Sequence, residues 1–175
     1  MEPTLKHYIQ FILDWALARD IIGQVGVRSR LATQKFKFMS ELGEYCDAVI
    51  KQVEPEIKDA IGDMFVVSCS IAYLDIANDT LDASYEHSEL TAKVQHKFAT
   101  TPDPDPDTVG STTIEELVYD LSQDVKYASI RSLWNTLFIL ALHHDTNLLD
   151  CVKGAYETIK DRTGKTLPNG NFVKD

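Results

Sequence analysis

Two glutamates, Glu41 and Glu44, lie three residues apart in a segment with helical apolar spacing, so they share one face of the expected helix. In the next segment Asp63 follows Asp59 by four residues and Glu56 by seven, which again places carboxylates on one side of a helix. Because only a short link joins the two segments, the two acidic faces are expected to meet. Carboxylates that converge beside an apolar core repel one another unless a cation neutralises them.

A cation held by carboxylates alone is expected to be a hard ion, because oxygen ligands favour Mg²⁺, and next Mn²⁺, over zinc. Magnesium keeps several of its waters and accepts phosphate oxygens, so such a site favours a phosphorylated substrate. The alternative is a solvated acidic face on a helical hairpin that binds no metal. Spacing alone leaves both interpretations open.

The acidic residues lie on two apolar-patterned segments that are expected to form the centre of an all-α fold. Apolar residues recur at helical spacing over 34–53, and a second such segment covers 56–75 or beyond. Pro55 ends the first helix and suits the first turn of the second, so the two segments form an antiparallel hairpin. Gly43 and Gly62 lie beside the acidic positions and are expected to let the two backbones approach closely.

The remaining chain is expected to add further helices and no substantial sheet. These helices cover 5–22, 112–144 and 147–162. A break is expected near Ser129, and the tail that follows Gly164 is predicted to be loop. Residues 1–175 are therefore predicted to form one all-α domain of four to six helices around a central antiparallel helical hairpin.

Residues 81–112 are less regular and are interpreted as an insertion. A short helix is predicted over 81–98. The Asp-Pro repeat at 101–107 is expected to stay outside any helix, because repeated prolines remove backbone donors and bias their neighbours toward extended shapes. It is interpreted as an exposed, flexible loop.

Composition narrows the functional classes. A net charge of −10 over 175 residues argues against a nucleic-acid binder, which would show a basic patch. Cys46, Cys69 and Cys151 lack CxxC spacing, which indicates packing roles in a reducing compartment. The N-terminus has no signal-peptide pattern, and the longest apolar stretch, 133–142, is about half as long as a membrane-spanning helix. We therefore expect a cytoplasmic protein with no nucleic-acid or membrane partner.

The two acidic segments resemble a known family signature. The sequences KFMSELGE (37–44) and EIKDAIGD (56–63) are similar to the paired glutamates and following E-x-x-D of MazG-like nucleoside triphosphate pyrophosphohydrolases. The ending, AYETIKDRTGK (155–165) followed by NGNFVK (169–174), resembles that of phage-encoded members, which would act in the host cytoplasm. The resemblance covers roughly 11–80 and 130–175.

The resemblance implies an all-α enzyme that uses Mg²⁺ to hydrolyse (deoxy)nucleoside triphosphates to monophosphate and pyrophosphate, as a homodimer or homotetramer. It implies that Glu41, Glu44 and Asp63 are metal ligands. Glu41 is the expected catalytic base, which takes a proton from the attacking water directly or through a second water. Trp15 fits the family's pattern but is expected to lie in the core. The residues expected at the phosphates or nucleotide are Gln34, Lys37, Lys160 and Arg162.

Three positions depart from the family's pattern. Ala60 stands where the glutamate of E-x-x-D is expected, Ser40 precedes the glutamate pair where another glutamate is frequent, and Glu157 replaces an asparagine of the last helix. Asp59 or Glu56 would then substitute as a metal ligand. Alternatively, the site binds fewer metal ions and works slowly, or the chain is an inactive form.

Two other functions follow if catalysis is lost. The first is a non-catalytic protein that binds nucleotide or metal, and the second is a helical interaction module that docks a partner on its acidic face. For the oligomer, the apolar face of 132–144 is the expected part of the interface, because short helices with broad apolar faces rarely bury everything in one small subunit.

Overall fold

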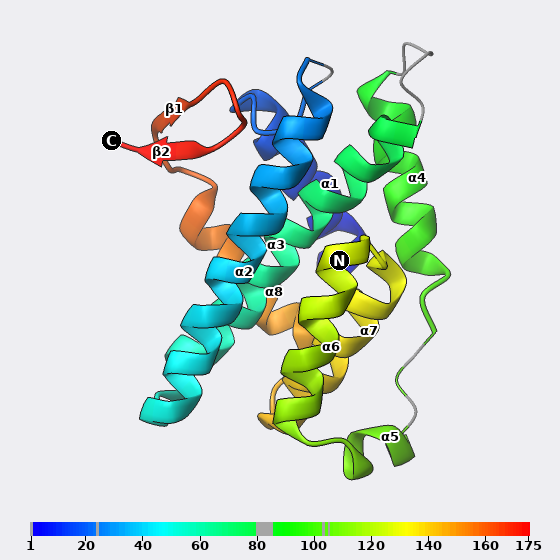
Figure 1. The fold of residues 1–175 in the computed structure, drawn as a ribbon, viewed down its shortest axis with the longest axis vertical. Helices are drawn as coiled ribbons and strands as arrows, with labels where there is room; N and C mark the ends of the chain where they lie inside the picture. Colours follow the sequence, from blue (N-terminus) through cyan, green and yellow to red (C-terminus); the bar gives the residue numbers. More distant parts are fainter. Residues whose placement is uncertain (1, 24, 80–85, 103, 105) are drawn as a thin grey trace.

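The chain folds into helices that surround one long central helix, and its last residues form a small β-hairpin (Figure 1). The computed structural model describes the whole chain except residues 1, 24, 80–85, 103 and 105. The elements of this described part are α1 (Leu5–Ala18), α2 (Val27–Lys51), α3 (Glu54–Asp79), α4 (His87–Ala99), α5 (Pro106–Ser111), α6 (Ile114–Tyr127), α7 (Ile130–His143), α8 (Leu148–Ile159), β1 (Gly164–Thr166) and β2 (Phe172–Lys174).

The predicted helical hairpin is confirmed by α2 and α3, which lie antiparallel and contact each other more than any other pair of described elements (Figure 1). Helix α2 ends where Gln52 adopts a left-handed backbone conformation with φ 58°, and its N–H donates to the last carbonyls of the helix. Pro55 lies in the first turn of α3, where the missing N–H costs no hydrogen bond.

Helix α3 is the core of the molecule. It packs against α1, α2, α4, α7 and α8, and an almost unbroken run of its residues from Ile57 to Leu74 is buried apart from Lys58, Asp59 and Asp63. By length and composition α3 could cross a membrane, but 78% of its apolar window is buried inside the protein. Its apolar character is therefore that of a core helix, which burial by the surrounding helices stabilises.

The expected number of helices was too low, because the described residues form eight rather than four to six. The segment 112–144 divides at Ala128, whose backbone is left-handed with φ 53°, so the break predicted near Ser129 is confirmed. The first helix ends at Ala18, earlier than expected. Helix α2 begins at Val27, seven residues before the expected start. Its first turn is mostly polar in sequence and buries the charged Arg30 as well as Val27, so the apolar pattern there was too weak to detect.

The prediction that the C-terminal tail is loop was wrong. Strands β1 and β2 pair antiparallel, with Lys165 opposite Val173. The connection turns at Gly170, whose φ of 83° favours glycine. Strands of only three residues leave too short a pattern to detect, so the all-α prediction holds for the body of the fold and fails at its end.

Within the 81–112 segment, helix α4 packs against the core. Helix α4 packs against α1, α3 and α7, and the Phe98 ring lies 5.3 Å from that of Trp134 between ring centroids. The expected helix start at 81–85 lies outside the described residues, as do Asp103 and Asp105 of the Asp-Pro repeat. Helix α5 begins at Pro106, so the expectation that the whole repeat stays non-helical was wrong at its end; proline is well tolerated at the first helical position.

The face of 132–144 is not free to form an interface. In α7 the apolar side chains pack inside the subunit, and Leu142 is the exposed exception. Trp134 is fully buried, and its Nε1 donates a hydrogen bond to Ser68 Oγ on α3 at 2.7 Å. The subunit therefore uses this face for its own core.

Candidate functional site

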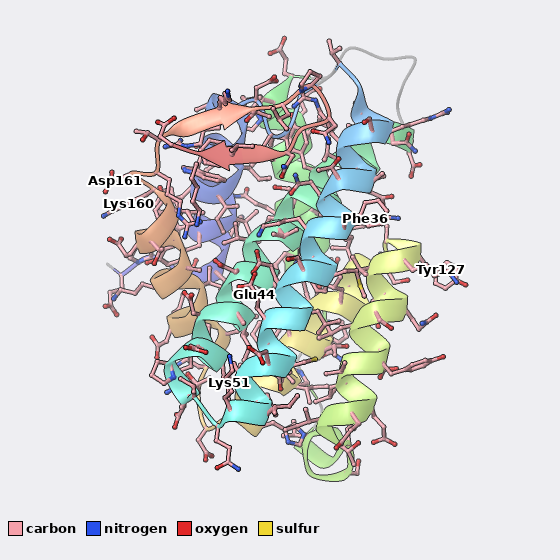
Figure 2. The ribbon with its side chains drawn as sticks, turned by 60° about the vertical axis from the view of Figure 1, so that its left-hand side comes forward. Phe36, Glu44, Lys51, Tyr127, Lys160 and Asp161 are labelled. Atoms are coloured by element: carbon pink, nitrogen blue, oxygen red, sulfur yellow. The ribbon has the colours of Figure 1, made fainter. Side chains whose placement is uncertain are left out.

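A cavity of about 200 Å³ lies between α2 and α3, and the end of α8 and the β-hairpin close it. Glu41 and Glu44 line it from α2, and Asp63 lines it from α3. The i, i+3 spacing of the glutamates and the antiparallel crossing of the helices place these three residues on the lining of one cavity. Figure 2 shows Glu44 at the junction of the two helices.

Glu41 is the most enclosed carboxylate of the cavity, with 3% of its surface exposed. Its Oε1 lies 2.5 Å from Lys37 Nζ, one turn earlier on α2. The ammonium of Lys37 therefore balances a charge that would otherwise be strongly disfavoured by burial. A bound cation would compete with Lys37 for this carboxylate.

Asp63 is the carboxyl whose protonation is most altered. Burial, and next the nearby charges of Glu41 and Asp59, raise its pKa from 3.8 to about 7, while Arg162 and Lys37 oppose the change. A carboxyl with this pKa carries a proton about half the time near neutral pH. Perturbation by desolvation and by like charge is typical of functional sites, although structural charge clusters share it.

A second cavity of about 170 Å³ adjoins the first on the acidic side, because Glu44 and Asp63 line both. The carboxylates of Asp47, Glu56 and Asp59 also line it. Ala60, which is 6% exposed, forms part of its wall, so a longer side chain at this position would enter a space already lined by acidic residues.

The donor set suits a hard cation in type, since both cavities are lined by carboxylates and neither by cysteine or histidine. No group of three Asp, Glu, His or Cys side chains among the described residues is close enough together to hold a metal ion in the present conformation. Ligation by Glu41, Glu44 and Asp63 therefore requires side-chain rearrangement. In the present conformation the Lys37 ammonium occupies one oxygen of the Glu41 carboxylate.

The four residues expected at the phosphates or nucleotide separate into two groups. Gln34, Lys37 and Arg162 line the first cavity. Lys160 lines neither cavity; it is exposed, and its Nζ lies 2.5 Å from Glu157 Oε2. Figure 2 shows Lys160 at the outer edge of the molecule, away from Glu44.

Several further cavity residues were not expected at the site from the sequence. Trp15, which was expected in the core, is half-buried and lines the cavity, and Asn171, Phe172 and Lys174 line it from the β-hairpin. The tail residues were missed because the tail was interpreted as loop. The signal that could have found them is Gly170, a turn residue directly before a short alternating run.

Comparisons with known proteins give a short match to a phage protein. Over 68 residues the chain is 38% identical to the "uncharacterized 18.2 kDa protein in rep-hol intergenic region" of Haemophilus phage HP1 (strain HP1c1). The match spans 39% of this chain and 39% of the phage protein, well under half of either. No family model and no solved structure matches the chain. The similarity agrees with the phage part of the resemblance, and membership of the MazG-like family stays a prediction.

Proposed function

We propose that this protein hydrolyses (deoxy)nucleoside triphosphates to monophosphate and pyrophosphate with the aid of Mg²⁺. The observation that carries the proposal is the meeting of Glu41, Glu44 and Asp63 in one cavity that Lys37 and Arg162 also line. Carboxylates suit Mg²⁺, and cations beside them suit the phosphate oxygens that Mg²⁺ binds jointly with protein. The burial of Glu41, which is 3% exposed, supports this function over a fully solvated acidic face.

The residues of this chain then have distinct roles in the proposed reaction. Glu41, Glu44 and Asp63 hold the divalent ion, which when bound neutralises charge on the phosphates. Lys37 and Arg162 contact phosphate oxygens, and Lys37 would be available for this if the divalent ion replaced its ammonium beside Glu41. Glu41 accepts the proton of the water that attacks phosphorus in line, directly or through a second water, and pyrophosphate leaves.

A second candidate function is a homologue that binds metal or nucleotide and turns it over slowly or not at all. Ala60 favours this candidate, because it removes a carboxylate from the wall of the acidic cavity. Glu56 and Asp59 line the same cavity and are the residues that could replace the missing ligand. A helical interaction module remains the third candidate and requires neither metal nor nucleotide.

A screen of pyrophosphate release tests the proposal across the four ribonucleoside and four deoxyribonucleoside triphosphates, with Mg²⁺ and with a chelator. We expect release that depends on Mg²⁺ and differs between nucleotides. Nucleotide binding without release supports the slow or inactive homologue instead. If neither binding nor release occurs, the interaction module becomes the leading function.

A further inference from the structure

The two ends of the first cavity differ in chemistry. Gln34 and Glu44 line it from positions ten residues apart on α2, which corresponds to about 15 Å along a helix. Because α3 runs in the opposite direction, Asp63 lies at the Glu44 end and Ser70 lies toward the Gln34 end. The carboxylates therefore occupy one end, and the uncharged side chains of Gln34 and Ser70 line the other, while the β-hairpin adds one charged side chain, that of Lys174.

The turn of the β-hairpin closes the end of the cavity that Gln34 lines. Gln34 Nε2 donates a hydrogen bond to the Gly170 carbonyl oxygen at 3.3 Å, which fixes the hairpin turn beside the first half of α2 (Figure 1). Gly170 fits there because it lacks a Cβ, which would lie 2.8 Å from the Cγ of the buried Arg30. The turn is thus packed against the body of the protein.

Side-chain alternation in β2 selects which residues face the cavity. Phe172 and Lys174 line it, while Val173 between them does not, as expected for a strand whose successive side chains point to opposite sides. The Phe172 ring meets the indole of Trp15 edge to face, with ring centroids 5.9 Å apart. Asn171, just before the strand, adds a half-buried carboxamide to the same wall.

Hydrogen bonds from α1 and the loop after it hold this wall in place. The Arg19 guanidinium donates to the backbone oxygens of Arg162, at 2.8 and 3.1 Å, and of Lys160, at 3.1 Å. The Thr166 hydroxyl donates to the Arg19 carbonyl oxygen, and Trp15 Nε1 donates to the Ile159 carbonyl oxygen at 2.8 Å. A wall fixed by this many contacts is preorganised, so little ordering is needed when a ligand binds.

We infer that the C-terminal β-hairpin is the nucleoside-binding wall of the cavity, in which Phe172 and Trp15 contact the base and the Asn171 carboxamide hydrogen-bonds to the nucleoside. This inference rests on the proposed function, which places the phosphates at the carboxylate end. The base then lies at the aromatic end, where a ring face or edge packs well against a planar ligand. The Asn171 amide offers both a donor and an acceptor, so it can read a base edge. The hairpin thus contributes selectivity and affinity rather than chemistry.

The test compares two substitutions in the same strand. Phe172→Ala removes an aromatic contact to the base, while Val173→Ala trims the neighbouring residue that does not line the cavity and serves as the matched control. With a non-hydrolysable deoxynucleoside triphosphate in calorimetry, Phe172→Ala is expected to raise Kd about tenfold, within the range that aromatic–base stacking supplies. KM should rise similarly with little change in kcat, and Val173→Ala should stay within about twofold of the native protein, because no base contact is lost.

Inorganic tripolyphosphate separates base recognition from general damage, because it carries the phosphates without a nucleoside. Its Kd is expected to be the same for Phe172→Ala and the native protein. A second variant, Asn171→Ala, is expected to reduce the differences in KM among nucleotides. This variant tests the inference even if Phe172→Ala does not fold.

Several results would overturn the inference. One is that Phe172→Ala behaves like Val173→Ala, and another is that it weakens tripolyphosphate as much as nucleotide. If Asn171→Ala leaves the ranking of nucleotides unchanged, the role given to its carboxamide is wrong. If the native protein hydrolyses nucleotides but these variants are indistinguishable from it, the inference about the hairpin is wrong and the proposed function stands. If the native protein binds neither nucleotide nor tripolyphosphate, the proposed function fails together with it.

Discussion

At the scale of single residues, the two most enclosed carboxyls of the cavity avoid an unbalanced negative charge in different ways. Glu41 is balanced by the ammonium of Lys37 at 2.5 Å. Asp63 has a pKa raised to about 7, chiefly by burial. An ion pair with a nearby ammonium and a raised pKa both reduce the repulsion between converging carboxylates. Their spacing was visible in the sequence, and so was the i, i+3 spacing that allows Lys160 to pair with Glu157.

The raised pKa of Asp63 predicts a pH-dependent stability in the metal-free protein. The folded state holds a proton that the unfolded chain, with a pKa near 3.8, has already released, so the free energy of unfolding falls as pH rises from about 4 to about 7. Each tenfold difference in proton affinity between the folded and unfolded states corresponds to about 1.4 kcal/mol. Urea unfolding in EDTA across this range measures the decrease, and Asp63→Asn should flatten the slope. Equal slopes in both proteins would contradict the assignment.

Replacement of the missing ligand is expected to increase activity. In Ala60→Glu the new carboxylate enters the cavity lined by Glu56 and Asp59, where it adds a ligand for Mg²⁺. We expect a faster pyrophosphate release at saturating Mg²⁺ and a lower melting temperature in EDTA, where the added charge has no partner. Ala60→Gln is the control of equal size. If both variants change the rate equally, the charge is not the limiting factor.

Removal of the proposed base should abolish most of the turnover. Glu41→Gln keeps the size and hydrogen-bonding capacity of the side chain but cannot accept a proton, so kcat should fall about 100-fold or more, the usual contribution of a general base. Glu89→Gln, on the exposed side of α4, controls for the loss of one negative charge. Full turnover by Glu41→Gln would show that another group takes the proton.

At the scale of elements, close packing sets the position of the acidic helices. A Cβ on Gly62 would lie 2.3 Å from the Cys151 carbonyl oxygen and 2.8 Å from the Ala155 Cβ, so the close approach made by Gly62 is to α8. Gly43 has open space around its missing Cβ. The expectation that both glycines bring α2 and α3 together was therefore wrong, since spacing along a helix does not reveal which neighbour each residue meets.

The two glycines should respond differently to the same substitution. Gly62→Ala is expected to lower the free energy of unfolding by about 1–3 kcal/mol, because α8 must move to make room. Gly43→Ala is expected to raise it by up to about 1 kcal/mol, the gain from replacing glycine within an exposed helix. Denaturant unfolding of the two variants and the native protein measures these changes in the free energy of unfolding. A neutral Gly62→Ala would mean that α3 and α8 are less closely packed.

The periodicity of the sequence was sufficient to predict the central hairpin and the last helix, since long amphipathic segments repeat their pattern over many turns. It was insufficient for the start of α2, a mostly polar turn that buries the charged Arg30 as well as Val27. It was also insufficient for β1 and β2, whose positions depend on contacts with Arg19 and Gln34 far away in the chain. For the same reason, the residues of the β-hairpin that line the cavity were not predicted.

At the scale of the whole molecule, the structure encloses its candidate site within one subunit. The apolar face of α7 serves the subunit core, so it offers no interface, and assembly as a homodimer or homotetramer stays a prediction that light scattering can test. Phe36 on α2 and Tyr127 on α6 are 77% and 67% exposed and lie on the outer surface in Figure 2. The absence of nucleic-acid and membrane partners and the cytoplasmic location also stay predictions.

The central claim is that carboxylates of α2 and α3 share a divalent ion that binds a polyphosphate. Calorimetric titration of a non-hydrolysable deoxynucleoside triphosphate, with Mg²⁺ and with EDTA, tests it most directly. We predict binding that requires Mg²⁺ and that weakens at least about tenfold, or about 1.4 kcal/mol, in Glu44→Gln. Binding of equal strength in EDTA, or no effect of Glu44→Gln, would contradict the claim.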